Sequence, residues 1–278
     1  MMLLIHSLEK GMRHPNPRSG FGHEKAESLH ARTKEYMEKH GIDQYSQLSL
    51  GVLKQYVGHP YAKSSSSLQL FVSETLRKHQ ALKPELLPGG AKSLDPADIL
   101  MCYEDAYKFV STRFSVRDFA QTEISDDHIS KAILFAQTTP SACNRQPSRV
   151  HIFSSKTTIA MILEHQLGDQ GWGSGACRLF VVTSLLSHFD GVYERYQMYI
   201  DGGMFAMQFV LALHSLRIAS CCKMYIRTPA TDKQFRLLTG ISRNEAPIML
   251  VLAGNYKEKP GPIPYSYRLS VDEIGKWH

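Results

Sequence analysis

Apolar residues recur at helical spacing through the first third of the chain. Residues 24–40 carry apolar side chains among charged ones, and Gly41 follows where glycine often ends a helix. A second apolar face covers residues 45–57 and stops at Gly58. The serines of residues 64–67 fit a linker or the start of another helix. We therefore expect this region to be helical, without strands.

The remaining two thirds combine short apolar runs with helical patterns. Residues 150–153, 179–183 and 248–253 are short, apolar and flanked by polar or turn residues, which predicts three strands. Helices are expected around them over residues 97–112, 125–138, 158–167 and 193–216. This order predicts an α+β fold in which helices pack against a sheet.

Several residues mark helix starts and a domain boundary. Asp95 and Pro96 fit the N-cap and the first turn of one helix, and Ser125 fits the cap of the next. Two Ser/Thr-x-x-Glu/Gln pairs match the capping box and predict two further helices: Thr231 with Gln234, and Ser270 with Glu273. Proline and glycine cluster between residues 84 and 96, so we expect a helical extension, residues 1–90, ahead of a domain spanning residues 91–278.

Composition narrows the functional classes. Of 278 residues, 43% are hydrophobic and 21% charged, as in globular proteins. The formal charge is +6, but there is no run of five Lys or Arg, so nucleic-acid binding gains little support. Five cysteines without a Cys-x-x-Cys pair favour a reducing cytoplasm and no metal site. No segment reaches the ~20 apolar residues of a membrane span.

Residues 113–119 could bind an anion. Arg113 and Arg117 offer forked, permanently charged donors that suit a phosphate, and Ser115 adds a neutral hydroxyl. Basic residues at the end of a helix also offset its dipole without any ligand, and this alternative stays open on spacing alone.

Residues 140–147 form a loop with proline at both ends. The prolines restrict the backbone, which would present Ser141, Asn144 and Gln146 in a fixed arrangement. Asn and Gln amides both donate and accept, as does the carbonyl–NH–carbonyl edge of a flavin. An ordinary polar turn has the same composition and is the alternative.

Together these two segments resemble the FMN site of the nitroreductase family. Its members carry Arg-x-Ser-x-Arg/Lys-x-Phe, then a helix, then Pro-Ser-x-x-Asn-x-Gln-Pro leading into a strand, and residues 113–119 and 140–147 match in that order. The resemblance covers about residues 97–278. It implies a nitroreductase-like fold with a mostly antiparallel central sheet flanked by helices. It also implies an intertwined homodimer with FMN at the interface, for which residues 193–216 would supply a central helix; a plain core helix is the alternative.

The resemblance implies roles for individual residues. Arg113, Ser115 and Arg117 would contact the phosphate, the ribityl chain or the pyrimidine edge, and Ser141 and Asn144 would approach the flavin from the second subunit. The cofactor-binding set implied in this way is Arg113, Ser115, Arg117, Pro140, Ser141, Asn144, Gln146 and Arg268. The last of these, an arginine ahead of the final helix, would reach the phosphate.

The chain departs from the family pattern in three places. Ser148 replaces the aromatic residue that often follows Gln-Pro, residues 217–220 replace a Gly-Leu-Gly segment, and no acidic-Gly loop is evident near residues 227–229. Nitroaromatic reduction is therefore not implied. Cys221 and Cys222 follow the altered segment and fit either a redox feature or small buried side chains.

The most specific hypothesis is an FMN-dependent oxidoreductase acting on a small molecule. NADH or NADPH would reduce the flavin and an organic acceptor would reoxidise it; no side-chain acid or base is evident. Residues 6–11 and 18–22 are similar to an extension of nitroreductase-like proteins associated with surface-polysaccharide synthesis, which suggests a sugar-linked acceptor. A dehydrogenase or oxidase running in the reverse direction, and a non-catalytic accessory protein, are the alternatives.

Overall fold

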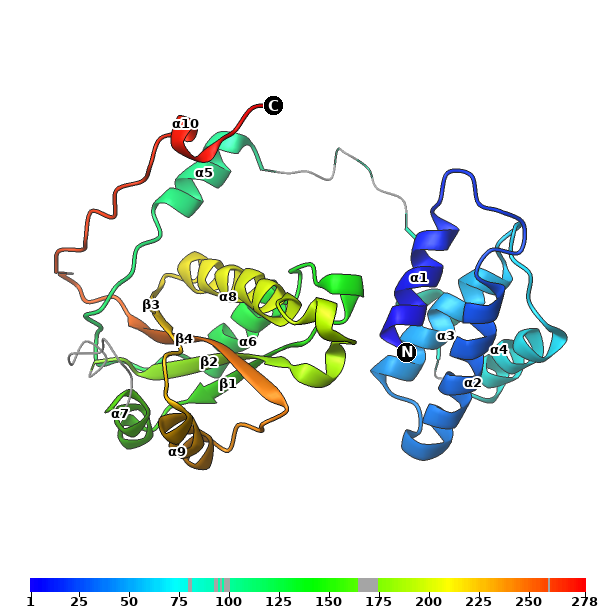
Figure 1. The fold of residues 1–278 in the computed structure, drawn as a ribbon, viewed down its shortest axis with the longest axis horizontal. Coiled ribbons are helices and arrows are strands. Elements are labelled where there is room, and N and C mark those ends of the chain that lie inside the picture. Colours follow the sequence, from blue (N-terminus) through cyan, green and yellow to red (C-terminus); the bar gives the residue numbers. More distant parts are fainter. Residues whose placement is uncertain (80–81, 93–94, 96, 98–100, 165–174, 260) are drawn as a thin grey trace. The chain divides into compact units, whose positions relative to one another are not determined.

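The computed structural model describes residues 1–79, 82–92, 95, 97, 101–164, 175–259 and 261–278. The chain forms two compact units (Figure 1). Contacts assign Met1–Leu100 and Ala142–Arg145 to an N-terminal unit, and Met101–Ser141 and Gln146–His278 to a C-terminal unit. No helix among the described residues is long and apolar enough to cross a membrane.

The N-terminal unit is helical, as its sequence predicts. Its elements are α1 (Met2–Met12), α2 (His23–His40), α3 (Gln44–Val57), α4 (Ser66–Lys78) and the 3₁₀ turn η1 (Pro84–Leu86). The expected helices over 24–40 and 45–57 are confirmed, and the serine run contains the start of α4, where the Ser65 hydroxyl accepts from Leu68 N. Helix α1 was not expected from the sequence. Leu8, Leu29 and Tyr56 are fully buried and join α1, α2 and α3 in one core.

Residues 84–91, here called the strap, run back across α3. The Gln55 side chain accepts from Ala91 N at 2.8 Å, and the Glu9 carboxylate on α1 accepts from Gly90 N at 3.0 Å. Gly51 makes the crossing possible, because an added Cβ would lie 2.0 Å from Pro88 O. Glu9 therefore has a structural role, since it holds the strap against α1. In the described part of the chain, no group of three or more His, Cys, Asp or Glu could hold a metal ion.

The C-terminal unit is built on a four-stranded antiparallel sheet in the order β1–β2–β4–β3. The strands are β1 (Ser148–Phe153), β2 (Arg178–Leu185), β3 (Ile218–Met224) and β4 (Glu245–Asn255). The three expected strands are confirmed. Strand β3 was not expected, because Ser220 and Lys223 interrupt its apolar pattern.

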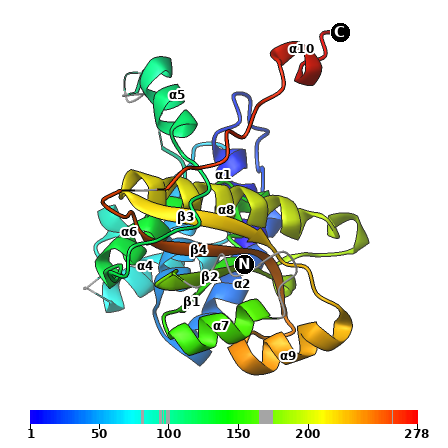
Figure 2. The same cartoon turned by 90° about the vertical axis from the view of Figure 1, so that its left-hand side faces the viewer.

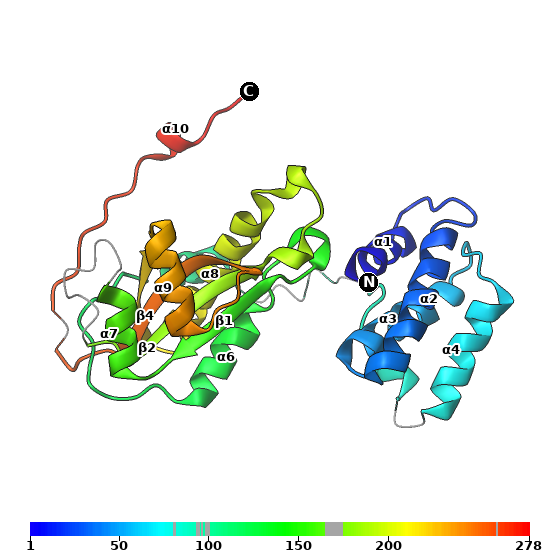
Figure 3. The same cartoon turned by 60° about the horizontal axis from the view of Figure 1, so that its bottom comes forward.

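Among the described residues, four helices cover the two faces of this sheet: α6 (Asp126–Ala136), α7 (Lys156–Glu164), α8 (Gln197–Ser215) and α9 (Pro229–Thr239). The other described helices after residue 100 are α5 (Tyr103–Ser111) and α10 (Val271–Ile274), and the 3₁₀ turns are η3 (Ala142–Asn144), η4 (Leu186–His188) and η5 (Val192–Glu194). Strand β2 separates two cores: Phe180 and Val182 pack with α6 and α8, whereas Leu179 and Val181 pack with α7 and α9. Figure 3 shows α7 and α9 together on their side of the sheet, and Figure 2 shows α5 and α10 extending away from it.

Some predicted boundaries and caps differ from the structure. Helix α5 begins at Tyr103, six residues after the expected start, and the Pro96 part of the expected cap lies outside the described residues. The capping box predicted at Thr231 is wrong: Thr228 is the N-cap and exchanges hydrogen bonds with Thr231, because Pro229 takes the first helical position. Ser270 does precede α10, but its side chain makes no capping hydrogen bond to this four-residue helix, so that box is also wrong.

Candidate functional site

The segment 113–124 is fixed against the ends of β3 and β4. Val116 N donates to Ser220 O at 2.9 Å, and Ala120 N donates to Asn255 O at 2.9 Å. The Asn255 amide in turn donates to Thr122 Oγ1 at 2.8 Å. These bonds hold the segment in register with the sheet.

Side-chain packing fixes the same segment a second time. The ring of Phe119 lies over Gly254, where an added Cβ would come 2.7 Å from Phe119 Cβ. Lys257 pairs with Asp118 at 2.6 Å, and Arg178 pairs with Glu123. Because the backbone is held on both sides, the side chains between residues 113 and 119 have defined positions.

Side chains alternate along this segment. Val116 is 7% exposed and belongs to the core shared with α7 and α9, whereas Ser115 and Arg117 on either side of it are only partly buried. Both line a cavity of about 670 Å³ at the edge of the sheet. The cavity is lined by Thr112, Phe114, Ser115, Val116, Arg117, Asp118, Tyr256, Gly261, Pro262, Ile263 and Pro264. We call it the edge cavity.

The edge cavity is rich in hydrogen-bond donors without partners. Among the described residues, the hydroxyls of Ser115 and Tyr256 make no hydrogen bond, and the guanidinium of Arg113 makes neither a hydrogen bond nor an ion pair. Arg117 reaches only Ser115 O, at 3.4 Å. The one carboxylate in the lining, Asp118, is already paired with a lysine. Such a set of donors suits a ligand that carries negative charge.

The positive charge of Arg113 affects the pKa values of three neighbouring groups. Burial lowers the pKa of His214, and the guanidinium of Arg113 lowers it further. Burial raises the pKa values of Tyr256 and Cys222, and Arg113 opposes both rises. Thr112, next in the chain, bonds His214 Nε2 through its hydroxyl at 3.1 Å, which ties the end of α5 to the end of α8. Arg113, which lies between the lining residues Thr112 and Phe114, is thus a cation without an ion-pair partner among the described residues.

The loop 140–147 has a strained backbone. Cys143, Asn144 and Gln146 have φ values of 52°, 50° and 51°, a left-handed conformation that is unusual for residues other than glycine. The Ser141 hydroxyl accepts from Gln146 N at 2.9 Å, and Pro147 O accepts from Leu185 N at 2.9 Å. The loop is therefore a defined structure rather than a loose turn.

The structure brings together only part of the predicted site. Ser115 and Arg117 line the edge cavity and Arg113 adjoins it, but none of the residues predicted from the loop 140–147 lies in its lining. Arg268 is exposed, and its guanidinium donates to Ser266 O at 2.7 Å on the extended segment before α10. Tyr256 and residues 261–264 were not predicted as site residues. The only signal for them in the sequence is that they follow the end of the strand expected at residues 248–253.

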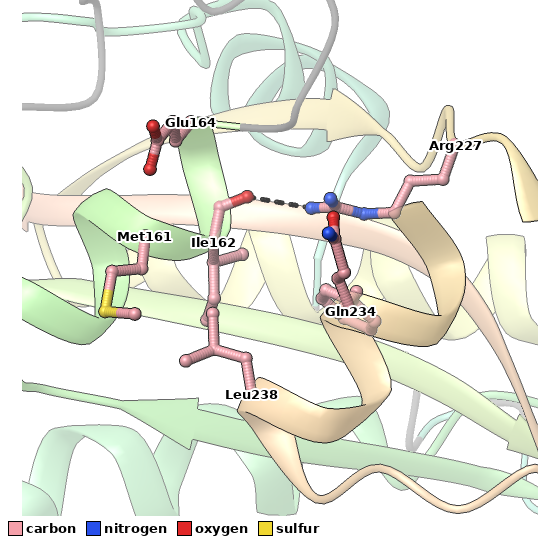
Figure 4. Close-up of a pocket in the computed structure, with 7 residues that line it drawn as sticks. Met161, Ile162, Glu164, Arg227, Gln234 and Leu238 are labelled. Carbon is pink, nitrogen blue, oxygen red and sulfur yellow. Dashed lines mark hydrogen bonds between the residues drawn. The ribbon is translucent and has the colours of Figure 1, made fainter. Parts of the chain in front are cut away.

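A second, smaller cavity of about 250 Å³ lies between α7 and α9 (Figure 4). Arg227 donates to Ile162 O at 2.8 Å and stacks on the ring of Phe235 at 4.6 Å. Met161 and Leu238 add apolar surface. The guanidinium thus satisfies a carbonyl in the last turn of α7, which is a structural role, and the edge cavity is the better candidate site.

Comparisons with known proteins bear on the fold of the C-terminal unit. Residues 110–171, which include both motifs, match the model of the nitroreductase family. A nitroreductase family protein of Streptococcus pneumoniae TIGR4 superposes with a TM-score of 0.52 at 20% identity, over 62% of this chain and 100% of that one. A nitroreductase-like protein of Streptococcus mutans superposes with a TM-score of 0.55 at 16% identity, over 64% of this chain and 100% of that one. A Clostridium acetobutylicum protein provisionally named NADH oxidase superposes with a TM-score of 0.51 at 16% identity, over 60% of this chain and 97% of that one.

These likenesses define the class of the C-terminal unit. At such identities the solved structures show a shared fold, and the family match includes the part of the cavity lining between residues 112 and 118. The C-terminal unit therefore has a nitroreductase-like fold, as the sequence predicted, and additional helices precede it in the chain. No curated protein matches the sequence significantly.

Proposed function

We propose that the C-terminal unit binds FMN in the edge cavity and acts as an FMN-dependent oxidoreductase. The observation that carries this proposal is the group of donors in and beside the cavity. Among the described residues, one arginine side chain and two hydroxyls of this group have no partner, and the one carboxylate in the lining is paired. FMN presents a phosphate and a ring with several acceptors, so its chemistry matches these donors. The cavity volume of about 670 Å³ lies within the usual range for cofactor sites.

The residues would hold the cofactor as follows. Arg113 and Ser115 would bind the phosphate or the ribityl chain, because the guanidinium is charged and neither side chain has a partner among the described residues. Arg117, on the same side of the strand-like segment as Ser115, would face the pyrimidine edge. Bound FMN would supply hydride chemistry, and the chain would position the ring and stabilise charge on it.

A second copy of the chain would complete the site. Helix α8 exposes four large apolar side chains, Tyr199, Ile200, Met204 and Met207, each between 40% and 55% exposed. Apolar surface of this kind favours burial against a partner. In such a homodimer the partner loop 140–147 would present Pro140, Ser141, Asn144 and Gln146 to the flavin. Arg268 would approach the phosphate.

The proposed reductant is NADH or NADPH, and the acceptor is a small organic molecule. The NADH oxidase name of the Clostridium acetobutylicum protein supports a nicotinamide reductant. A sugar-linked acceptor rests only on the likeness of residues 6–11 and 18–22, where Glu9 already has a structural role. A cytoplasmic location fits the five free cysteines.

The visible spectrum of the purified protein tests this function. We expect flavin absorbance, bleached under anaerobic conditions by NADH or NADPH and restored by air. A protein that binds FMN but stays oxidised with both nucleotides would instead support a dehydrogenase or oxidase. A colourless protein that takes up no added FMN would contradict the proposal.

A further inference from the structure

Tyr256 occupies a fixed place at the edge cavity. It follows directly on Asn255, whose carbonyl accepts from Ala120 N and whose amide bonds Thr122. The next residue, Lys257, is held by its ion pair with Asp118. The neighbours of Tyr256 on both sides therefore hold its backbone at the rim of the sheet, where its side chain lines the cavity.

The phenol of Tyr256 is available to a ligand. Its side chain is 38% exposed and lines the cavity, yet its hydroxyl makes no hydrogen bond with any described residue. It lies within electrostatic reach of Arg113, whose positive charge favours negative charge in the same place. A neutral donor beside an unpaired arginine is a typical arrangement for recognising a phosphate.

We propose that Tyr256 donates its hydroxyl to the phosphate of FMN and makes the cavity select phosphorylated flavin over riboflavin. This inference rests on the proposed FMN site and names a binding residue that neither motif contains. The phosphate is the strongest acceptor of FMN, because it carries between one and two negative charges near neutral pH. Ribityl hydroxyls and ring carbonyls, which riboflavin shares, are weaker acceptors.

The test compares two flavins on two proteins. Dissociation constants for FMN and riboflavin are measured by flavin fluorescence on the full chain and on Tyr256→Phe, which removes one oxygen and keeps the ring. A charge-assisted hydrogen bond of this kind corresponds to a loss of about tenfold or more in FMN affinity. Riboflavin affinity should stay within about twofold, since its complex lacks the phosphate.

Tyr265→Phe is the matched control, because Tyr265 is 87% exposed and lies outside the cavity lining. It should change neither constant, and unchanged thermal unfolding of both variants verifies the fold. The inference fails if Tyr256→Phe leaves FMN affinity unchanged, or lowers the affinities for both flavins equally. If the unaltered chain binds neither flavin, the proposed function itself fails and this inference fails with it.

Discussion

Phe119 and Gly254 are in direct contact across the edge of the sheet. A Cβ on Gly254 would lie 2.7 Å from Phe119 Cβ and 2.9 Å from its Cγ, so only glycine fits at this position of β4. Phe119 is 1% exposed and lies two residues after Arg117. The contact therefore sets the depth at which the whole segment 113–119 sits on the sheet.

Gly254→Ala should disturb this segment. Overpacking of a buried contact costs typically about 1–3 kcal/mol, and here the strain would move Phe119 and with it Ser115 and Arg117. We expect lower thermal stability together with weaker FMN binding, measured by calorimetry and fluorescence titration. Gly58→Ala in the N-terminal unit, where no atom would lie closer than 3.7 Å to the new Cβ, is the control and should keep both properties. Normal FMN affinity in Gly254→Ala would argue against this role of the contact.

Gly51→Ala should loosen the strap of residues 84–91. The new methyl would meet Pro88 O at 2.0 Å, so the strap has to move away from α3 and Gly90 N would lose the Glu9 carboxylate. We expect a loss of about 1–3 kcal/mol and faster amide exchange at Gly90 and Ala91, measured by hydrogen–deuterium exchange. Gly58→Ala, whose Cβ would have no neighbour closer than 3.7 Å, should keep strap protection. Equal protection in both variants would refute the assigned role of Gly51.

Glu245 should make stability depend on acid. Burial would raise the pKa of its carboxyl, but hydrogen bonds from Thr183, at 2.5 Å, and His151, at 2.7 Å, outweigh this and leave the pKa below its ordinary 4.5. Because the pKa is lower in the folded state, the ionised carboxyl stabilises the fold at pH values above 4.5. This contribution is lost as the pH falls through the pKa of the folded state.

Glu245→Gln tests this dependence. At pH 7 the variant should be less stable by about 1–3 kcal/mol, because a buried hydrogen-bonded group is altered. The difference should shrink below pH 4.5, where the native carboxyl also becomes protonated. Urea unfolding at several pH values measures it. A difference that stays constant from pH 7 to well below 4.5 would exclude a lowered pKa.

Cys222 should be slow to react. Cys222 is exposed, so the expectation of a small buried side chain is wrong for this residue. Desolvation of its thiol nevertheless raises its pKa to about 11, so the reactive thiolate is scarce near neutral pH. Its neighbour Cys221 is buried in the core. We expect iodoacetamide to label the exposed Cys102 first at pH 7, with labelling of Cys222 rising only in alkaline solution. Rapid labelling of Cys222 at pH 7, followed by peptide mass spectrometry, would revive the redox alternative.

The sequence predicted much of the fold because its strongest signals are local. Helical spacing located α2 and α3, and apolar runs located β1, β2 and β4. Strand β3 escaped prediction because its place in the sheet comes from pairing with β4, as in Ser220 with Ala253, and not from its own pattern. The N-cap at Thr228 was not predicted, because Thr228 and Thr231 both fit the N-cap position in the sequence.

The candidate site could be predicted only where it is continuous in sequence. Ser115 and Arg117 flank one buried residue, and this alternation is visible in the chain itself. Tyr256 joins them across about 140 positions, and only the folded sheet brings it to the same cavity. The positive φ of Cys143 likewise has no local signal, since nothing in that residue type favours it.

A titration of the full chain with FMN, alongside Arg113→Ala, tests the flavin site most directly. We expect saturable, stoichiometric binding by the unaltered protein. The variant should bind at least about tenfold more weakly with its fold unchanged, because a charged donor to the phosphate is lost. An unaltered protein that shows no saturable binding, or a variant with the same affinity, would contradict the assignment of the edge cavity as a flavin site.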